Sequence, residues 1–576
     1  MGTACVVIAW LSFGTATVFY RRVSLSLWAM RLGAGSLTIA LSLLGYAFLR
    51  GQFELAYVID YARIGVSPVI RLGGLWAGPE GSLLLFTTIL AWWALVVSRR
   101  VDGSEFVPEP LLVGVLSLLS VVVALIASPF VRAAQPLNDG SGLQPVLEHP
   151  AMGYHPPLLY AGLCGLLAVG LAIRLGGQRR HQLGRVALAL AAIGLVSGSR
   201  WAFAEVGWGG YWAWDPIENG ALVAWTVGLV ALHAPARSAR LLWVVTGIAA
   251  LWSTVLTRIG VVSSVHAFAN NPELRRSLLA IAVLTTVAVA VLARQLVIPT
   301  HTTPARKRSI LGTAIMAAIA LIIAVGTYKP LLGWVVSGST SMVSGEYYSG
   351  LLWLPTVVGL VALSRADAHL WSAALGSVCG LALAGSGAQV GSYILVAAGG
   401  AVAGTGFWAA RRRPRALAHA GIGLVLLGVG GSASSQTDVL YLTVDETVTW
   451  EDTTATHRGI MFFEEGRGTE VVATLDLAGT RLKPSVRTDI ARGIGSAEVA
   501  THLTVRGEYH VVFQDSTADT ARYQLTWIPL LGFVWLGGTL TSLGLLAPRT
   551  WRRESSHTDR GSTLGSVLPL VGEELV

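Results

Sequence analysis

Long apolar segments recur along this 576-residue chain and leave few folds open to it. Each of fifteen runs is long enough to cross ~30 Å of hydrocarbon, which takes roughly 20 helical residues. Charged residues make up 13% of the chain, whereas soluble proteins carry about 25%. The sequence therefore predicts a polytopic α-helical membrane protein with about 15 transmembrane helices. The runs centre on Val7, Ile39, Ile89, Val122, Gly165, Ala191, Gly228, Trp252, Val287, Ile319, Val358, Gly376, Val396, Leu424 and Leu536.

Arginine and lysine cluster in alternate connections between these runs, and the positive-inside rule assigns such connections to the cytoplasm. With an odd number of spans, the N-terminus is then expected outside and the C-terminus inside. The net charge of +9 is explained by this topology and does not indicate nucleic-acid binding. We expect no cleaved signal peptide. The clusters are Arg21, Arg22 and Arg31; Arg99 and Arg100; Arg179, Arg180 and Arg185; Arg237 and Arg240; Arg306, Lys307 and Arg308; Arg365; Arg411, Arg412, Arg413 and Arg415; and Arg549, Arg552 and Arg553.

One long insertion, residues 434–526, alternates apolar and polar residues between Gly and Asp turns. Such alternation predicts β-strands, so a small β-rich extracytoplasmic domain is expected between the last two helices, and we interpret it as a docking surface. The predicted division is a transmembrane core over 1–433, this domain, a last helix over 527–547 and a polar cytoplasmic tail over 548–576, expected to be disordered.

The three cysteines exclude several functions. Cys5, Cys164 and Cys379 are isolated within apolar runs, which is typical of inert thiols. The chain has no C-x-x-C motif of a dithiol oxidoreductase and no C-x-x-C-H motif of a c-type cytochrome. It also lacks the P-loop motif of a nucleotide hydrolase.

The segment 207–219 is unusually rich in aromatic residues, which belong to Trp208, Tyr211, Trp212 and Trp214. Two acids, Asp215 and Glu218, follow directly. One interpretation is an aromatic belt at a membrane interface. The other is a flat stacking platform for a large planar ligand with polar edges, such as a porphyrin. The acids either take part in this site or cap the following helix, a role that suits Glu218 better.

Two pairs of histidines stand out because histidine is a common haem ligand. His155 and His266 lie at the outer surface on either side of the Trp-rich loop, and axial haem ligation or contact with a backbone carbonyl would explain either. The other eight histidines, including His457 and His510 of the β-rich domain, are expected to be solvated polar residues.

The second pair, His233 and His419, lies inside the predicted membrane. His233 is fourteen residues beyond Asn219, or roughly 21 Å along a helix, and His419 follows Arg415 by about one turn. Both imidazoles therefore reach a similar depth in the inner half. Bis-His ligation of a buried b haem is the economical interpretation, and histidines that snorkel to the interface are the alternative.

Several motifs together resemble the CcmF family, the haem lyase subunit of the bacterial multi-component cytochrome c maturation system. The resemblance covers about Tyr57–Leu546, with Pro79 as a departure where relatives often have a polar residue. It implies that His155 and His266 bind external haem iron and that His233 and His419 hold a resident b haem. The motifs are the Trp-rich segment, Trp76–Leu83, Tyr154–Tyr160, Leu256–Gly260 followed by His266, and Ala418–Gly421.

The resemblance also implies an activity. A haem lyase takes substrate haem from a haem chaperone, CcmE, at the outer face of the bacterial inner membrane and promotes its thioether attachment to the CxxCH cysteines of apocytochrome c. Thiol-handling subunits of the CcmH/CcmI type are the implied partners, and quinol is a candidate reductant for the b haem. The residues placed at the reaction site are Trp208, Tyr211, Trp212, Trp214 and Asp215.

Two other functions stay open. A haem transporter without ligation activity is the first alternative, although the chain shows no internal repeat and its polar residues gather at the two membrane faces. A subunit of an ion-pumping complex is suggested by Glu80 and Lys329 near helix ends, but it leaves the Trp-rich loop unexplained.

Overall fold

The computed structural model describes residues 1–99, 106–205, 210–262, 264, 271–296, 307–366, 370–384, 390–465, 468–490, 493–517 and 520–548. Each of the predicted apolar runs lies in a helix. These helices are α1 (Gly2–Val18), α2 (Val23–Arg50), α5 (Pro79–Val97), α6 (Pro110–Leu125), α7 (His155–Leu171), α8 (Gly177–Glu205), α9 (Pro216–His233), α10 (Ala236–Leu256), α11 (Pro272–Leu296), α12 (Lys307–Ser337), α13 (Gly345–Ala366), α14 (Leu370–Ala384), α15 (Val390–Ala410), α16 (Leu417–Ser432) and α17 (Gly532–Leu546).

The helices have the length and composition of a multi-pass membrane protein. Within the described residues, 9 helices are long and apolar enough to cross a membrane, and four shorter apolar helices accompany them. Close contacts between helices use small residues, as expected in lipid. A Cβ added at Gly421 of α16 would lie too close to the carbonyl oxygen of Gly537 in α17, and a Cβ added at Gly537 would lie too close to the carbonyl oxygen of Gly421. The predicted fold class is confirmed.

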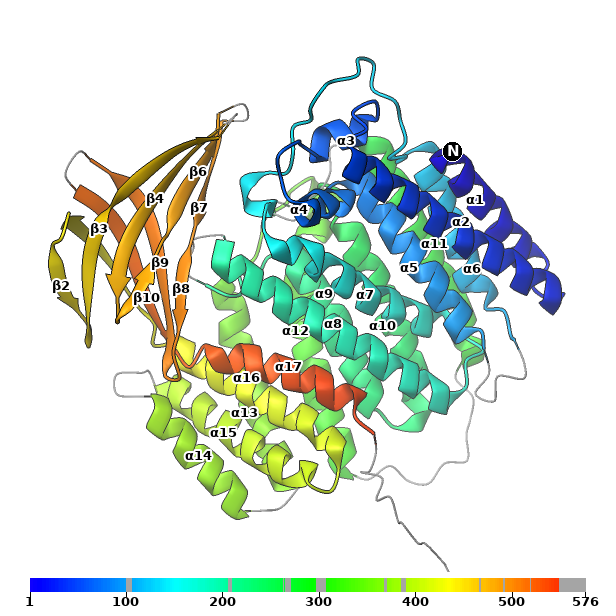
Figure 1. Cartoon of the computed structure of the whole chain (residues 1–576). Helices are drawn as coiled ribbons and strands as arrows, with labels where there is room; N and C mark the ends of the chain where they lie inside the picture. Colours follow the sequence, from blue (N-terminus) through cyan, green and yellow to red (C-terminus); the bar gives the residue numbers. More distant parts are fainter. Residues whose placement is uncertain are drawn as a thin grey trace, which may run out of the picture.

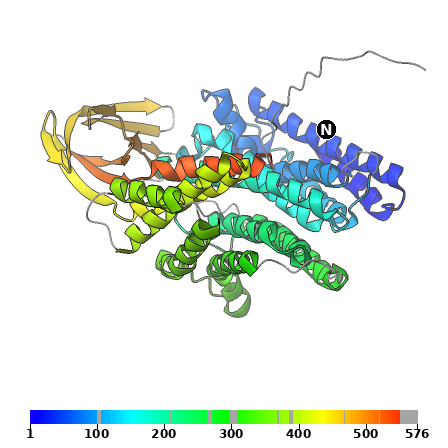
Figure 2. The same cartoon turned by 90° about the horizontal axis from the view of Figure 1, so that it is seen from below.

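The bundle is arranged around α7, α8 and α9, which pack against one another and carry the Trp-rich loop between α8 and α9. Helices α1, α2 and α6 lie on one side, and α14–α17 lie below the β-strands on the other (Figure 1). Helices α12 and α13 belong to a separate green layer along one flank (Figure 2). The connections also contain α3 (Ala56–Tyr61), α4 (Pro68–Gly73), η1 (Gly74–Trp76), η2 (Pro145–Leu147), η3 (Pro150–Gly153) and η4 (Pro414–Ala416).

The β-rich domain defines two ends of the bundle. The chain enters it directly after α16 and leaves it directly before α17, so the C-terminus of α16 and the N-terminus of α17 lie at what we call the β-domain end. The connection between α6 and α7 lies there too, because its short helix η2 contacts β7. The start of α1 lies at the same end, because Gly2 contacts Phe130 in that connection. The C-termini of α5, α7 and α9 lie at the opposite end of the bundle.

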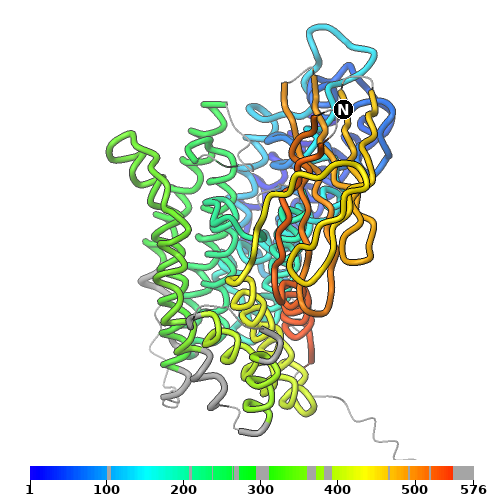
Figure 3. Tube along the Cα trace, turned by 90° about the vertical axis from the view of Figure 1, so that its left-hand side faces the viewer, coloured from blue at the N-terminus to red at the C-terminus, as the bar shows by residue number. Residues whose placement is uncertain are grey.

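Two antiparallel sheets form the β-rich domain, which Figure 3 shows above α14–α16. One has the order β1-β10-β9-β8; the other has the order β2-β3-β4-β6-β7, with β5 beside β4. Strand β10 continues to Pro529, beyond the predicted boundary at residue 526. The strands are β1 (Gln436–Thr443), β2 (Thr447–Trp450), β3 (Thr453–Glu465), β4 (Gly468–Leu477), β5 (Thr480–Leu482), β6 (Ser485–Asp489), β7 (Ile494–Glu498), β8 (Ala500–Leu503), β9 (Gly507–Ser516) and β10 (Thr520–Pro529).

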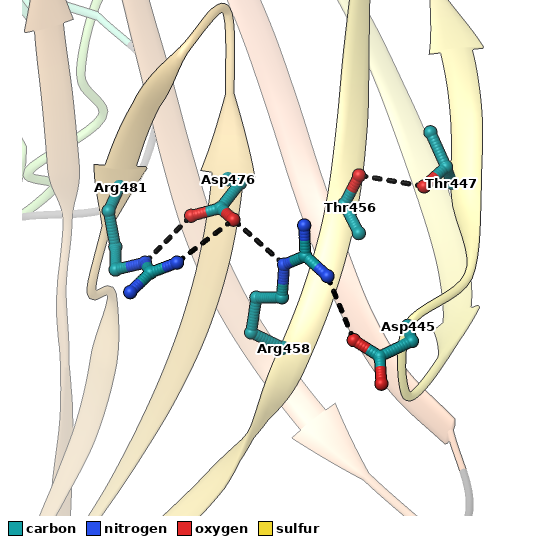
Figure 4. Close-up of polar contacts among 6 residues, drawn as sticks. All are labelled: Asp445, Thr447, Thr456, Arg458, Asp476 and Arg481. Atoms are coloured by element: carbon teal, nitrogen blue, oxygen red, sulfur yellow. Dashed lines mark hydrogen bonds and ion pairs between the residues drawn. The ribbon is translucent and has the colours of Figure 1, made fainter.

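An ionic ladder crosses the surface of the second sheet (Figure 4). Arg458 of β3 bridges Asp445 and Asp476, with distances of 2.9 and 2.8 Å, and Arg481 of β5 also binds Asp476 at 2.8 Å. Hydrogen bonds from Arg481 and Arg458 lower the pKa of Asp476 to about 2. Because these ion pairs are largely exposed, we expect each of them to contribute little to the stability of the domain.

Candidate functional site

The Trp-rich loop ends at a capped helix. Asp215 is the N-cap of α9: its Oδ1 accepts from the backbone N–H groups of Ile217 (2.8 Å) and Glu218 (3.4 Å), and Pro216 follows at the first helical turn. The expectation that Glu218 suits this role better is therefore wrong, because only the shorter Asp side chain at the cap position reaches those N–H groups. The Glu218 Oε2 atom is buried and has no hydrogen-bond partner in the described part of the chain.

Asn219 ties the loop to the start of α9. Its side-chain carbonyl accepts from the Trp212 indole N–H at 3.2 Å, and its amide donates to the Trp214 backbone carbonyl at 2.8 Å. Asn219 is fully buried. Trp214 has a φ of +56°, a conformation that non-glycine residues rarely adopt. The amide of Asn219 therefore holds both tryptophans in a fixed and strained arrangement.

The rings of Tyr211, Trp212 and Trp214, which are the described ones of this loop, do not form one flat platform, and this corrects that part of the prediction. Trp212 and Trp214 meet at 82° with ring centroids 6.4 Å apart. Trp214 instead stacks on Tyr348 of α13, with centroids 4.4 Å apart and planes 4° apart. Tyr211 meets Trp535 of α17 edge to face. The rings make an angled surface supported by neighbouring helices; Trp208 lies outside the described residues.

His155 lies at the N-terminus of α7, at the β-domain end. Its Nδ1 is 2.8 Å from the carbonyl oxygen of Gly194, and its ring stacks on Trp201 with centroids 6.3 Å apart. A Cβ added at Gly198 would lie 2.2 Å from the His155 ring, so this glycine gives the imidazole its place against α8. A carbonyl at Nδ1 orients an imidazole so that Nε2 can serve as a ligand. His266 lies outside the described residues.

His233 and His419 meet at the opposite end of the bundle. Their ring centroids are 6.1 Å apart and their planes differ by 39°. Two imidazoles that bind one metal from opposite sides, each about 2 Å from nitrogen to metal, have centroids about 6 Å apart. The His233 Nδ1 is 2.9 Å from the Leu229 carbonyl oxygen, which directs Nε2 away from its own helix. The pair fits axial ligation of one haem iron.

Arg258 is a residue that we did not predict for the site. It is fully buried, and its Nη2 donates to Ser82 and to the hydroxyl of Tyr160, each at 3.0 Å. These three residues come from the motifs Leu256–Gly260, Trp76–Leu83 and Tyr154–Tyr160, so one guanidinium joins the N-terminal end of α5 to α7 and α10. Pro79, the departure noted above, is the first residue of α5, where proline is well tolerated.

The β-rich domain is fixed to α8 just before the Trp-rich loop. Arg200 of α8 binds the fully buried Glu508 of β9 at 2.6 Å, and Trp535 donates to the same carboxylate at 3.2 Å. Contrary to expectation, His510 and His457 are buried rather than solvated. His510 Nε2 is 3.1 Å from the Phe203 carbonyl oxygen, and burial lowers the pKa of His510 to about 4. These contacts tie the domain to α8 and α17 next to the loop.

Comparisons with known proteins find similarity to proteins of cytochrome c assembly. Residues 180–243, which contain the Trp-rich loop, match the family model described as Cytochrome C assembly protein. A probable cytochrome c-type biogenesis protein, NrfE of Escherichia coli (strain K12), is 32% identical over 56% of this chain and 65% of its own length. The cytochrome c-type biogenesis protein CcmF of Pseudomonas fluorescens is 28% identical over 90% of this chain and 89% of its own.

A solved structure, described as the cytochrome c heme lyase CcmF, has the same fold. It superposes with a TM-score of 0.73 at 22% sequence identity, covering 95% of this chain and 96% of that chain. In the NrfE alignment the chain spans just under two thirds of its relative, whereas the Pseudomonas fluorescens alignment and the superposition run nearly end to end. The chain is therefore similar to cytochrome c-type biogenesis proteins of the CcmF and NrfE kind, and it shares the fold of CcmF.

Proposed function

We propose that this chain is a haem lyase, which promotes thioether attachment of haem to the CxxCH cysteines of apocytochrome c. The observation that carries the proposal is the aromatic surface of Trp212 and Trp214, which Tyr348 supports. The backbone carbonyl of Tyr211 in the same loop accepts a hydrogen bond from Ser199 of α8, and its ring meets Trp535 of α17. A loop meant only to anchor in the lipid interface would not need an orienting amide, a helix cap and a stacked tyrosine.

The proposed orientation puts the β-domain end outside the cytoplasm, in the bacterial inner membrane, with the N-terminus outside. The arginine-rich connections support it, because those within the described residues, such as Arg21, Arg179 and Arg411, join helices at the opposite end. The aromatic surface then faces the compartment where apocytochromes await their haem, and the C-terminus faces the cytoplasm.

The reaction adds each cysteine S–H across a haem vinyl group. The sulfur bonds to the vinyl carbon next to the porphyrin ring and the terminal carbon gains a hydrogen, so the addition needs no net oxidant. This chain's part is to hold the substrate: Trp208, Tyr211, Trp212 and Trp214 would fix the macrocycle, and His155 with His266 would bind its iron. Holding two reactants in register can be worth up to about 7–11 kcal/mol.

His233 and His419 would hold the resident b haem, which supplies one-electron transfer when bound. Their separation suits this ligation, and their place near the opposite end of the bundle gives access to a membrane reductant such as quinol. Within the described residues no group of three or more His, Cys, Asp or Glu side chains could hold a separate metal ion.

Partners follow from what the chain lacks. Its three cysteines are isolated, so a reduced substrate dithiol must be supplied by thiol-handling subunits of the CcmH/CcmI type. Substrate haem would come from a chaperone of the CcmE type, and the β-rich domain beside the Trp-rich loop is the proposed docking surface.

The test is cytochrome c maturation in cells that lack their own haem lyase and express this chain with its partner subunits. His155→Ala and His266→Ala should each abolish covalent haem in the apocytochrome, measured by in-gel haem staining and the pyridine haemochrome of c-type haem. The b-haem spectrum should persist in both variants. His502→Ala, a histidine of the β-rich domain outside the site, is the matched control and should mature cytochromes normally.

Two outcomes would contradict the proposal. Normal cytochrome yield from His155→Ala would remove it from the ligand set. If the unmodified chain delivers haem to the outer face but no thioether forms even with reduced apocytochrome and all partners present, the alternative of a haem transporter without ligation activity is correct.

A further inference from the structure

A pocket of about 530 Å³ opens at the end of the bundle opposite the β domain. It lies where α5 and α7 end and where α6 and α8 begin. Arg99, Arg174 and Arg179 line it, and Glu109 is the single carboxylate among the described lining residues. Small-molecule sites in proteins commonly have volumes of about 300–1,000 Å³. The pocket therefore has the size of a ligand site and a positive charge.

The N-terminus of α8 opens into this pocket. Gly176, which precedes the helix, has no side chain to cap it, and the first turn contains no acid but does contain Arg179. A Cβ added at Gly176 or Gly177 would meet nothing within 4 Å, so the space in front of the helix is open. The first N–H groups of a helix and its dipole attract an anion, and a cation in the same turn strengthens that attraction.

A second observation points to a ligand independently. Ser98 lines the pocket and is only 1% exposed, yet its hydroxyl has no hydrogen-bond partner in the described part of the chain. A buried hydroxyl is normally satisfied, so an unpartnered one implies a group that completes it. The guanidinium of Arg179 is also only partly satisfied. Its Nη2 donates to the Val96 carbonyl oxygen at 2.9 Å, while its buried Nε has no hydrogen-bond partner in the described part of the chain.

Glu109 offsets only part of this charge, because three arginines and one carboxylate are among the described lining residues. Both of its carboxylate oxygens accept from the backbone N–H of Arg174, each at 3.1 Å. The Arg174 guanidinium itself lies over the ring of Tyr20, 4.9 Å from its centroid. Glu109 thus orders the connection between α7 and α8, while Arg99 and Arg179 are left to face the pocket.

We propose that this pocket binds a phosphate group, with its oxygens against the first turn of α8, Arg99, Arg179 and the Ser98 hydroxyl. The head group of an anionic phospholipid and free phosphate share this chemistry. The lipid is the better match to the position, because basic pockets between helices at the cytoplasmic surface suit anionic head groups.

The experiment measures the apparent Tm of the purified full chain in neutral detergent at constant ionic strength. The probes are inorganic phosphate, short-chain phosphatidylglycerol and short-chain phosphatidylcholine. Phosphatidylglycerol well above its Kd should raise the Tm by roughly 2–4 °C, more than phosphatidylcholine does. The double variant Arg99→Gln/Arg179→Gln should lose the rise, and Arg411→Gln, an exposed arginine at the end of α15, should keep it. An equal rise with inorganic phosphate would identify free phosphate as the source.

A pair of substitutions separates loss of the site from loss of the fold. Gly176→Asp and Gly176→Asn both supply a side-chain cap for α8, so neither should lower the Tm without ligand. Only Asp adds a negative charge in front of the helix, so it should abolish the ligand-induced rise while Asn retains it. The proposal is overturned if no phosphate-bearing probe raises the Tm, if phosphatidylcholine matches phosphatidylglycerol, or if the double arginine variant responds as the unmodified chain does.

Discussion

The indole of Trp214 lies flat against the ring of Tyr348, with centroids 4.4 Å apart, although 134 positions separate the two residues in the sequence (348 minus 214). Tyr348 is buried, and the absence of a side chain at Gly326 of α12 gives room for its hydroxyl. One face of the Trp214 indole is thus covered by Tyr348. The loop presents to a ligand only what this stack and Asn219 leave accessible.

We expect Tyr348→Ala to reduce the yield of covalent haem about 2- to 10-fold, because an aromatic pair contributes about 0.5–1.5 kcal/mol beyond its buried area. Tyr348→Phe keeps the stacked ring and should retain most of the yield. The measurement is in-gel haem staining normalised to the amount of chain in the membrane. Tyr347→Phe, which loses only a hydrogen bond to Ile322, serves as the control. Equal losses from Ala and Phe at position 348 would show that the hydroxyl matters rather than the stack.

The role of Asp215 can be separated from chemistry by two substitutions. Asn caps helices about as well as Asp, so Asp215→Asn should mature cytochromes at close to the normal level. Asp215→Ala removes the cap and should cost about 0.5–2 kcal/mol of stability. The comparison measures cytochrome yield and apparent Tm for both. A variant with Asn that is stable but inactive would assign the carboxylate to the reaction itself.

The helices were predictable because each depends on a local signal. All fifteen apolar runs, including the weak ones at Val358 and Gly376, lie in helices, since composition and length alone specify a membrane helix. The proximity of His233 to His419 also followed, because alternate helix direction places both at one depth. The separation of 6.1 Å between their ring centroids, however, depended on packing that topology does not specify.

What could not be predicted are the contacts between segments far apart in the chain. The stack of Trp214 on Tyr348 and the ion pair of Arg200 with Glu508 join residues far apart in the chain, and no pattern of residue spacing in the sequence predicts them. The buried histidines of the β-rich domain were misjudged for a related reason. A polar residue in a strand of alternating apolar and polar residues is predicted to be exposed. His510 instead faces α8 at the junction with the helices, where the Phe203 carbonyl accepts its hydrogen bond.

Loss of either member of the inner histidine pair should remove the b haem. His233→Ala or His419→Ala leaves the iron with one axial ligand at most, so the low-spin b-type signal in a reduced-minus-oxidised spectrum should disappear or fall several-fold. His181→Ala is the matched control, because His181 lies near the same end, in the first turns of α8, and should leave the spectrum unchanged. Full b-haem content with an unaltered spectrum in both variants would mean that the pair does not ligate haem.

The attachment of the β-rich domain should weaken in acid because of His510. Its folded-state pKa, about 4, lies below the usual value of 6.5, since burial disfavours the imidazolium. Between these two values the unfolded chain binds more protons than the folded one, so stability falls as the pH drops through this window. The difference amounts to about 2 kcal/mol on going from pH 7.5 to pH 5. We expect the apparent Tm of the purified chain to fall over that range, and His510→Gln, which cannot titrate, to show a smaller fall. His502→Gln, a half-buried histidine of the same domain, should behave like the unmodified chain. If His510→Gln loses as much stability in acid as the unmodified chain, the acid sensitivity arises elsewhere in the molecule.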